Sequence, residues 1–161
     1  MKPKLQLCIM MLMALSLTAC KRPAEPLALK LQQHNDTLHQ ITLLADNQPV
    51  DSLMLPYRVY HFDYADLTGD GVPEVIVGVI KKTRYWQTED KRIFIYHLFK
   101  SRYIRPLWLG SRLGNPIKDF RVNKQTTPAS IVTEEWDEDS TIIGREYVMG
   151  GFGLKYKGPT P

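Results

Sequence analysis

Apolar and polar residues alternate along most of the chain from Tyr57 to Tyr156, which is the pattern of half-buried β-strands. The segment 73–80 (PEVIVGVI) is instead a dense β-branched run. Turns rich in Gly, Pro and Asp separate the segments, and no long stretch shows the 3.6-residue period of a helix. The pattern predicts a mainly β, antiparallel domain. The expected core residues are Phe62, Val75, Ile76, Val77, Ile93, Ile95 and Leu107.

The residues before Tyr57 give an ambiguous pattern. Segment 27–33 (LALKLQQ) is consistent with a short helix. Segment 38–44 (LHQITLL) is consistent with a first strand, whose apolar side chains need cover.

A weak internal repeat relates two parts of the chain. Segments 62–77 and 117–132 align with Pro73 on Pro128, and a hairpin is expected after each. The alignment predicts two units, 57–110 and 115–158, of about four strands each, the strand count of a propeller blade. Two blades cannot close a ring, so one or two such units would pack as a sandwich or a strongly twisted sheet.

The first twenty residues have the composition of a secretory signal. Lys2 and Lys4 precede an apolar stretch from Leu5 to Leu17, and small residues lead to Cys20. The apolar stretch is shorter than the ~20 residues of a membrane-spanning helix. We therefore expect residues 1–19 to be removed, followed by a polar tether at 20–30 and one β-rich domain at 31–161.

The sequence Leu17-Thr18-Ala19-Cys20 resembles the lipobox of bacterial lipoproteins. The resemblance implies that the Cys20 thiol carries a diacylglyceryl group, that its new amino group is acylated, and that the protein is anchored to a membrane of the bacterial envelope. Lys21 follows the cysteine, which by resemblance to enteric sorting rules favours the outer membrane. The alternative is an ordinary secretory signal with an incidental cysteine.

The charge of the chain excludes one class of partner. Loss of Lys2 and Lys4 with the signal lowers the formal net charge from +4 to +2, which is too small to indicate nucleic acid binding. Basic residues dominate segment 81–121, and acidic residues dominate segment 134–139. These segments represent either solvated strand faces with a charged turn or two opposed patches that steer a partner.

The segment Asp66–Glu74 (DLTGDGVPE) runs directly into the β-branched strand and resembles the FG-GAP or VCBS repeat of integrin-like propellers. Calcium takes six to eight oxygen ligands. Asp66, Asp70 and Glu74 would supply carboxylates, Thr68 a hydroxyl and Val72 a backbone carbonyl. The repeat usually has Asp or Asn where Thr68 stands, and the equivalent segment of the second unit has no carboxylate. The alternative is a metal-free turn in which Asp66 and Asp70 accept backbone hydrogen bonds.

Aromatic and basic residues indicate a contact surface more than an active site. An expected hairpin loop carries Tyr85 and Trp86 beside Arg84, and Arg92 follows a few residues later, which suits contact with a protein or a glycan. Trp108 and Trp136 are expected in the core. His61 and Asp63 lie on the same face of an expected strand, but the chain has no phosphate loop, nucleophile elbow or paired-carboxylate motif.

Together these features predict a membrane-anchored, non-enzymatic lipoprotein of the cell envelope that serves as a binding or scaffold module, with one calcium ion as a candidate stabiliser. The alternative is a small accessory enzyme or inhibitor at the envelope. A concave pocket that gathers His61 and Asp63 would favour catalysis. A flat face with aromatic and basic residues would favour binding.

Overall fold

The computed structural model describes residues 27–84, 86–110 and 113–160, and every regular element in these ranges is a β-strand. All the strand pairs are antiparallel. Within the described residues, no helix has the length and apolar character needed to cross a bilayer. The prediction of a mainly β, antiparallel domain is confirmed.

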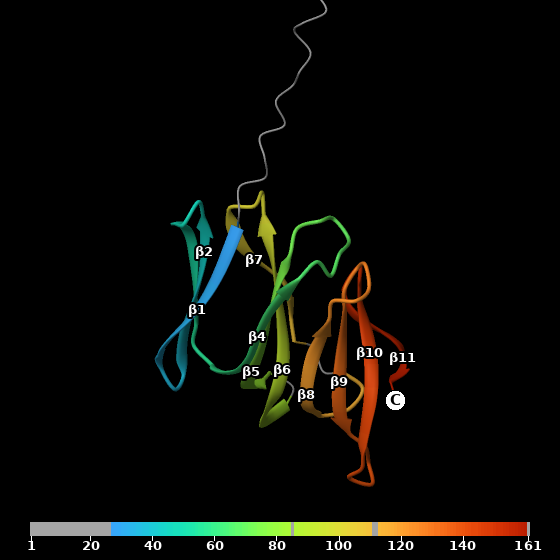
Figure 1. Cartoon of the computed structure of the whole chain (residues 1–161). Coiled ribbons are helices and arrows are strands. Elements are labelled where there is room, and N and C mark those ends of the chain that lie inside the picture. Colours follow the sequence, from blue (N-terminus) through green and yellow to red (C-terminus); the bar gives the residue numbers. More distant parts are fainter. Residues whose placement is uncertain (1–26, 85, 111–112, 161) are drawn as a thin grey trace, which may run out of the picture.

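The strands form three sheets, in each of which every strand pairs with the next one along the chain. The first sheet contains β1 (Leu27–Asn35), β2 (Leu38–Ala45) and β3 (Gln48–Leu55). The central sheet contains β4 (Arg58–Ala65), β5 (Glu74–Thr83), β6 (Trp86–Phe99) and β7 (Tyr103–Leu109). The third sheet contains β8 (Ile117–Asn123), β9 (Ser130–Trp136), β10 (Ile142–Gly150) and β11 (Gly153–Thr160). Figure 1 shows the three sheets side by side in chain order.

The central sheet is covered on both faces, which explains the dense apolar run in its second strand. Val75, Val77 and Val79 belong to a core cluster shared with the first sheet. Ile76 belongs to a separate cluster shared with the third sheet. All residues from Glu74 to Val79 are buried. Alternation of polar and apolar residues disappears because neither face of β5 meets water.

The ambiguous segment 27–33 lies in a strand, not a helix. In β1, Leu27, Leu29 and Leu31 pack against the cluster between the first and central sheets. Lys30 and Gln32 alternate with them and are exposed. Residues 27–30, assigned to the tether from sequence, are therefore the start of the first sheet. Residues 20–26 lie outside the described part of the chain.

Most of the expected core residues are buried, but two expectations are wrong. Val75, Ile76, Val77, Ile93 and Ile95 are buried and Phe62 is half-buried. Leu107, however, is 41% exposed because β7 is an edge strand of the central sheet. Trp136 is also 41% exposed. The preceding residue, Glu135, points into the core, so the alternation of β9 directs Trp136 outward.

Candidate functional site

The loop that connects β4 to β5 is held by side chains accepting hydrogen bonds from its own backbone. Asp66 Oδ1 accepts the Gly69 amide at 2.6 Å, and Asp66 Oδ2 accepts the Gly71 amide at 2.9 Å. Asp70 Oδ1 accepts the Val72 amide at 2.8 Å. Gly69 and Gly71 have φ of 82° and 83°, a left-handed conformation that glycine adopts without a steric cost.

Glu74 closes the loop from inside the protein. Its Oε2 accepts the amides of Leu67 at 2.8 Å and Thr68 at 3.2 Å, and its Oε1 accepts the Thr68 hydroxyl at 3.2 Å. The side chain is buried. Burial raises the pKa of Glu74 above its ordinary value, although the hydrogen bond from the Leu67 amide acts in the opposite direction.

These are the contacts expected of the metal-free turn. The carboxylates are directed at loop amides, and the described residues contain no group of three or more His, Cys, Asp or Glu side chains that would hold a metal ion. In this conformation the donor set does not fit calcium, which needs six to eight converging oxygens. A calcium site in this loop remains a prediction from sequence, with the ligands Asp66, Thr68, Asp70, Val72 and Glu74.

The loop has a neighbour on each side. On one side, the Ala129 amide donates to the Asp66 carbonyl at 2.8 Å, so the corresponding loops of the central and third sheets touch. On the other side, a cavity of about 230 Å³ separates Asp70 and Glu74 from the end of β6, where His97, Phe99 and Lys100 line it. The loop therefore lies between the third sheet, to which it is bonded, and the turn between β6 and β7.

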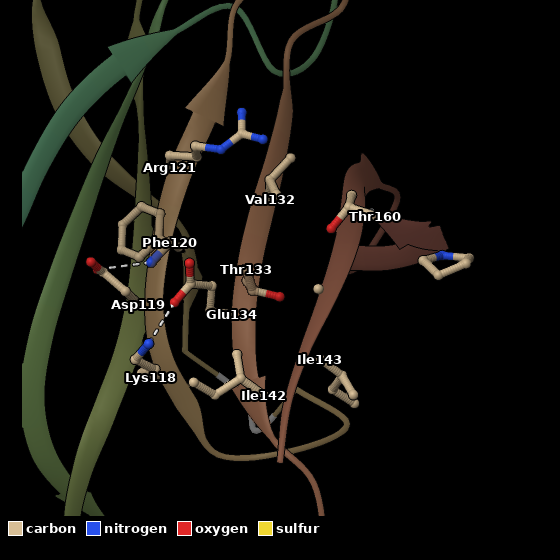
Figure 2. A pocket seen from close by; sticks show the side chains of 12 residues that line it. Lys118, Asp119, Phe120, Arg121, Val132, Thr133, Glu134, Ile142, Ile143 and Thr160 are labelled. Atoms are coloured by element: carbon tan, nitrogen blue, oxygen red, sulfur yellow. Dashed lines mark hydrogen bonds and ion pairs between the residues drawn. The ribbon is translucent and has the colours of Figure 1, made fainter.

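The outer face of the third sheet carries a larger open depression of about 620 Å³ (Figure 2). Lys118 on β8 bonds to Glu134 on β9 at 3.0 Å, and the Lys118 ammonium lies 5.9 Å from the Trp136 ring. The side chain of Arg121, also on β8, has no hydrogen-bond or ion-pair partner among the described residues. Ile142 supplies an exposed apolar side chain. The face thus combines two basic residues (Lys118 and Arg121) and two acidic residues (Asp119 and Glu134) with apolar surface.

A glycine helps to shape this depression. Gly144 on β10 pairs with Thr160 on β11, and a Cβ at Gly144 would overlap the Thr160 hydroxyl. Sequence reasoning did not find this face. Its residues come from strands whose outward positions are known only once the register between β8, β9 and β10 is fixed.

The opposite face of the third sheet buries a carboxylate. Glu135 is completely buried. Its Oε1 accepts the Thr133 hydroxyl at 2.7 Å and the Tyr147 hydroxyl at 2.8 Å, and its Oε2 accepts the Asn115 amide at 3.1 Å. The Nε of Arg145 lies 3.6 Å from Oε2. The pKa of Tyr147 is raised to about 12, mainly because the hydroxyl is buried and to a smaller extent because it donates to Glu135. A fully satisfied buried carboxylate of this kind is structural.

The candidate catalytic pair does not form a site. The His61 ring packs on Phe120 with centroids 4.4 Å apart. Asp63 forms an ion pair with Lys124 at 2.6 Å. The two side chains thus have separate partners on β8 and the loop that follows it.

The predicted aromatic–basic surface is only partly brought together. Arg84 and Trp86 are exposed at the turn between β5 and β6. Arg92 is 3% exposed, so it does not share that surface, and its charged partner is Asp90 at 3.6 Å. The alternation of β6 places Arg92 on the face that packs against the first sheet, as it does for Phe94 and Tyr96. Tyr85 and Cys20 lie outside the described residues.

Comparison with known proteins adds no family assignment: no protein-family model, curated protein or solved structure matches this chain. The resemblances to the lipobox and to the FG-GAP repeat therefore rest on the residues Leu17–Cys20 and Asp66–Glu74 alone.

Proposed function

We propose that this protein is a membrane-anchored, non-enzymatic binding module of the bacterial envelope, and that it presents the outer face of its third sheet to another envelope protein. The observation that carries this proposal is the open depression of about 620 Å³ beside Arg121, Trp136 and Ile142. The first sheet, by contrast, has polar residues such as Lys30 and Gln32 facing outward.

The chemistry of the face suits recognition. Trp and Arg dominate the energetics of protein interfaces because both combine a large contact area with directional polar groups. Arg121 has its full set of guanidinium donors available for a carboxylate of a partner. Ile142 and the exposed ring of Trp136 supply apolar area. The expected partner surface is therefore apolar with an acidic group.

The enzymatic alternative gains no support from its candidate residues. His61 is packed on an aromatic ring, and Asp63 is neutralised by Lys124. A general base needs to be within hydrogen-bond reach of a substrate proton, which these two contacts do not favour. Binding is thus the better supported activity.

Anchoring completes the proposal. The lipobox resemblance places lipid on Cys20, and residues 21–26 are all that separate this cysteine from the first strand at Leu27. Two or more acyl chains give stable attachment to a bilayer. The domain is thereby held close to the membrane, with the outer membrane favoured by Lys21.

Site-specific crosslinking in the native envelope tests the binding face. A photoreactive residue replaces Ile142, and the matched control replaces Met54, an exposed residue of β3 on the first sheet. We expect one dominant protein adduct from position 142, none of the same mass from position 54, and loss of the adduct when Arg121→Glu is added. The same adducts from both positions would contradict the proposed face.

A further inference from the structure

The turn between β6 and β7 has an unusual backbone. Lys100 and Ser101 both have φ of 53°. The Ser101 amide donates to the Leu98 carbonyl at 2.9 Å, and the Arg102 amide donates to the Phe99 carbonyl at 3.1 Å. A hairpin turn with two left-handed residues normally uses Asn and Gly. Lys100 and Ser101 occupy these positions although neither residue type favours a positive φ. The preference for turn formation therefore does not explain their presence here.

The side chains around this turn are aromatic and basic. Phe99 and Tyr103 pair directly across the hairpin and are 47% and 42% exposed. The Lys100 ammonium lies 5.4 Å from the Phe99 ring centre, and the Arg105 guanidinium lies 5.1 Å from that of Tyr103. Together with the exposed Arg102, these residues form what we call the aromatic–basic tip.

The carboxylates that face the tip are Asp51 on β3 and, across the cavity of about 230 Å³, Asp70 and Glu74. Among the described residues, Lys100 and Arg102 have no carboxylate within ion-pair distance, whereas Arg105 lies 3.8 Å from Asp51. Asp51 is already engaged, because its Oδ2 accepts the Ile104 amide at 2.7 Å. The residues of the tip itself therefore combine two exposed aromatic rings with the three positive charges of Lys100, Arg102 and Arg105.

The tip lies at the end of the molecule where the described chain begins. Leu29 on β1 pairs with Leu43 on β2, and Leu43 pairs with Asp51 on β3. Asp51 in turn bonds to Ile104, which follows Tyr103 on β7. The start of β1 and the β6–β7 turn thus lie at the same end of the structure, as Figure 1 also shows.

The covalent chain limits how far this end can lie from the anchor. Residues 21–26 separate Cys20 from Leu27. At ~3.3–3.6 Å per residue, even a fully extended chain spans no more than about 25 Å. Lys21 and Arg22 add two positive charges within the same span. A lipid-anchored Cys20 therefore holds the aromatic–basic tip near the bilayer surface.

We infer that the aromatic–basic tip is a membrane-docking site that contacts anionic phospholipid headgroups. This inference rests on the lipid anchor of the proposed function. Tyrosine and other aromatic side chains favour the bilayer interface, and Lys and Arg are attracted to anionic lipids. Docking orients the domain with its β6–β7 turn on the membrane. The third sheet lies beside the central sheet, and its outer face, which is turned away from the central sheet, then remains open to a partner (Figure 1).

Vesicle binding by the unacylated chain tests the tip independently of the anchor. The protein begins at position 20 and carries Cys20→Ala, so no lipid contributes. We expect it to co-sediment at low salt with phosphatidylcholine vesicles that contain phosphatidylglycerol, and to bind vesicles of pure phosphatidylcholine far more weakly. Each Lys or Arg near an anionic bilayer strengthens binding about fivefold, so Lys100→Gln with Arg102→Gln should weaken it about 25-fold.

The matched control neutralises Lys82 and Arg84, which lie beside the start of β6, at the opposite end of that strand from the tip. Lys82→Gln with Arg84→Gln should leave vesicle binding within about twofold of the parent.

A Phe99→Trp variant should show a fluorescence blue shift with anionic vesicles and quenching by brominated lipid. No binding by the parent, equal losses in the two double variants, or an unshifted emission spectrum of the Phe99→Trp variant would overturn the inference. The crosslinking test at position 142 and the mass of the Cys20 lipid remain separate, so failure here is distinguishable from failure of the proposed function.

Discussion

The hydrogen bond from Tyr147 to the buried Glu135 can be tested by a single substitution. Tyr147→Phe removes only the hydroxyl that donates to Glu135 Oε1 at 2.8 Å. The ring remains in the core cluster between the central and third sheets, so the buried apolar area is almost unchanged. The substitution therefore isolates one polar contact of a fully buried carboxylate.

The expected cost follows from the surroundings of Glu135. The Thr133 hydroxyl, the Asn115 amide and Arg145 stay in place, so the carboxylate loses one of four stabilising contacts. A hydrogen bond to a charged group contributes about 1.5–3 kcal/mol, and water cannot easily replace it at a buried atom. We expect the free energy of unfolding to fall by about 2 kcal/mol and the melting temperature by about 4–8 °C.

Urea unfolding followed by tryptophan fluorescence measures this cost. The control is Tyr156→Phe, because the Tyr156 ring also packs on Tyr147 but is exposed to solvent. Its free energy of unfolding should change by less than about 0.5 kcal/mol. In a Glu135→Gln background, the effect of Tyr147→Phe should shrink to about 1 kcal/mol, since the acceptor is then neutral. Equal losses for Tyr147→Phe and Tyr156→Phe would refute the buried network.

The raised pKa of Tyr147 adds a pH dependence to the same comparison. The folded phenol ionises near pH 12 and the unfolded phenol near pH 10. A raised pKa stabilises the folded state below the unfolded value, and this stabilisation is lost as the pH passes through the folded value. The advantage of the wild type over Tyr147→Phe should therefore be constant up to about pH 9 and decline between about pH 10 and 12. An advantage that stays constant through this range would contradict the burial of the hydroxyl.

Three further predictions address the anchor and the loop. Mass spectrometry should find mature chains that begin at a lipidated Cys20, and mature chains whose Cys20 carries no lipid would exclude the lipid anchor. If the loop rearranges to hold calcium, millimolar calcium should raise the melting temperature of the wild type by a few degrees, and Asp70→Ala should abolish that increment. If the wild type melts at the same temperature in calcium and in chelator, the loop is a turn without metal. Because burial raises the pKa of Glu74 in the folded state, the stability of the wild type relative to Glu74→Gln should decrease as the pH rises above the ordinary glutamate pKa of 4.5. An opposite slope in urea unfolding would show that the amides of Leu67 and Thr68 outweigh burial.

Several features of the fold follow from short stretches of sequence. The alternation of apolar and polar residues after Tyr57 predicts the strands because side chains of a strand alternate between its two faces. The Asp and Gly residues of 66–71 predict a turn, since Asp accepts local amides and Gly adopts positive φ. These features depend on neighbours within a few residues, so local sequence is enough to indicate them.

Other features depend on strands that are distant in the sequence. Segment 27–33 forms a strand because Leu29 and Leu31 find cover against the central sheet, which begins only at Arg58. Leu107 lies at an edge and is exposed although its own segment is apolar. Local pattern cannot distinguish these outcomes, because burial is set by which sheets stack on each other.

The same holds for the candidate sites. The sequence by itself placed Asp66, Asp70 and Glu74 in one loop, and only the tertiary structure directed their oxygens at backbone amides. The sequence grouped Glu134 and Glu135 as one acidic segment, whereas the fold exposes the first and buries the second beside Arg145 and Tyr147. The aromatic–basic tip lies at the same end of the molecule as the start of β1 only because β3 and β7 are in contact. Residue type and spacing are local properties, but the direction of a side chain, its burial and its nearest charge are decided by contacts between sheets.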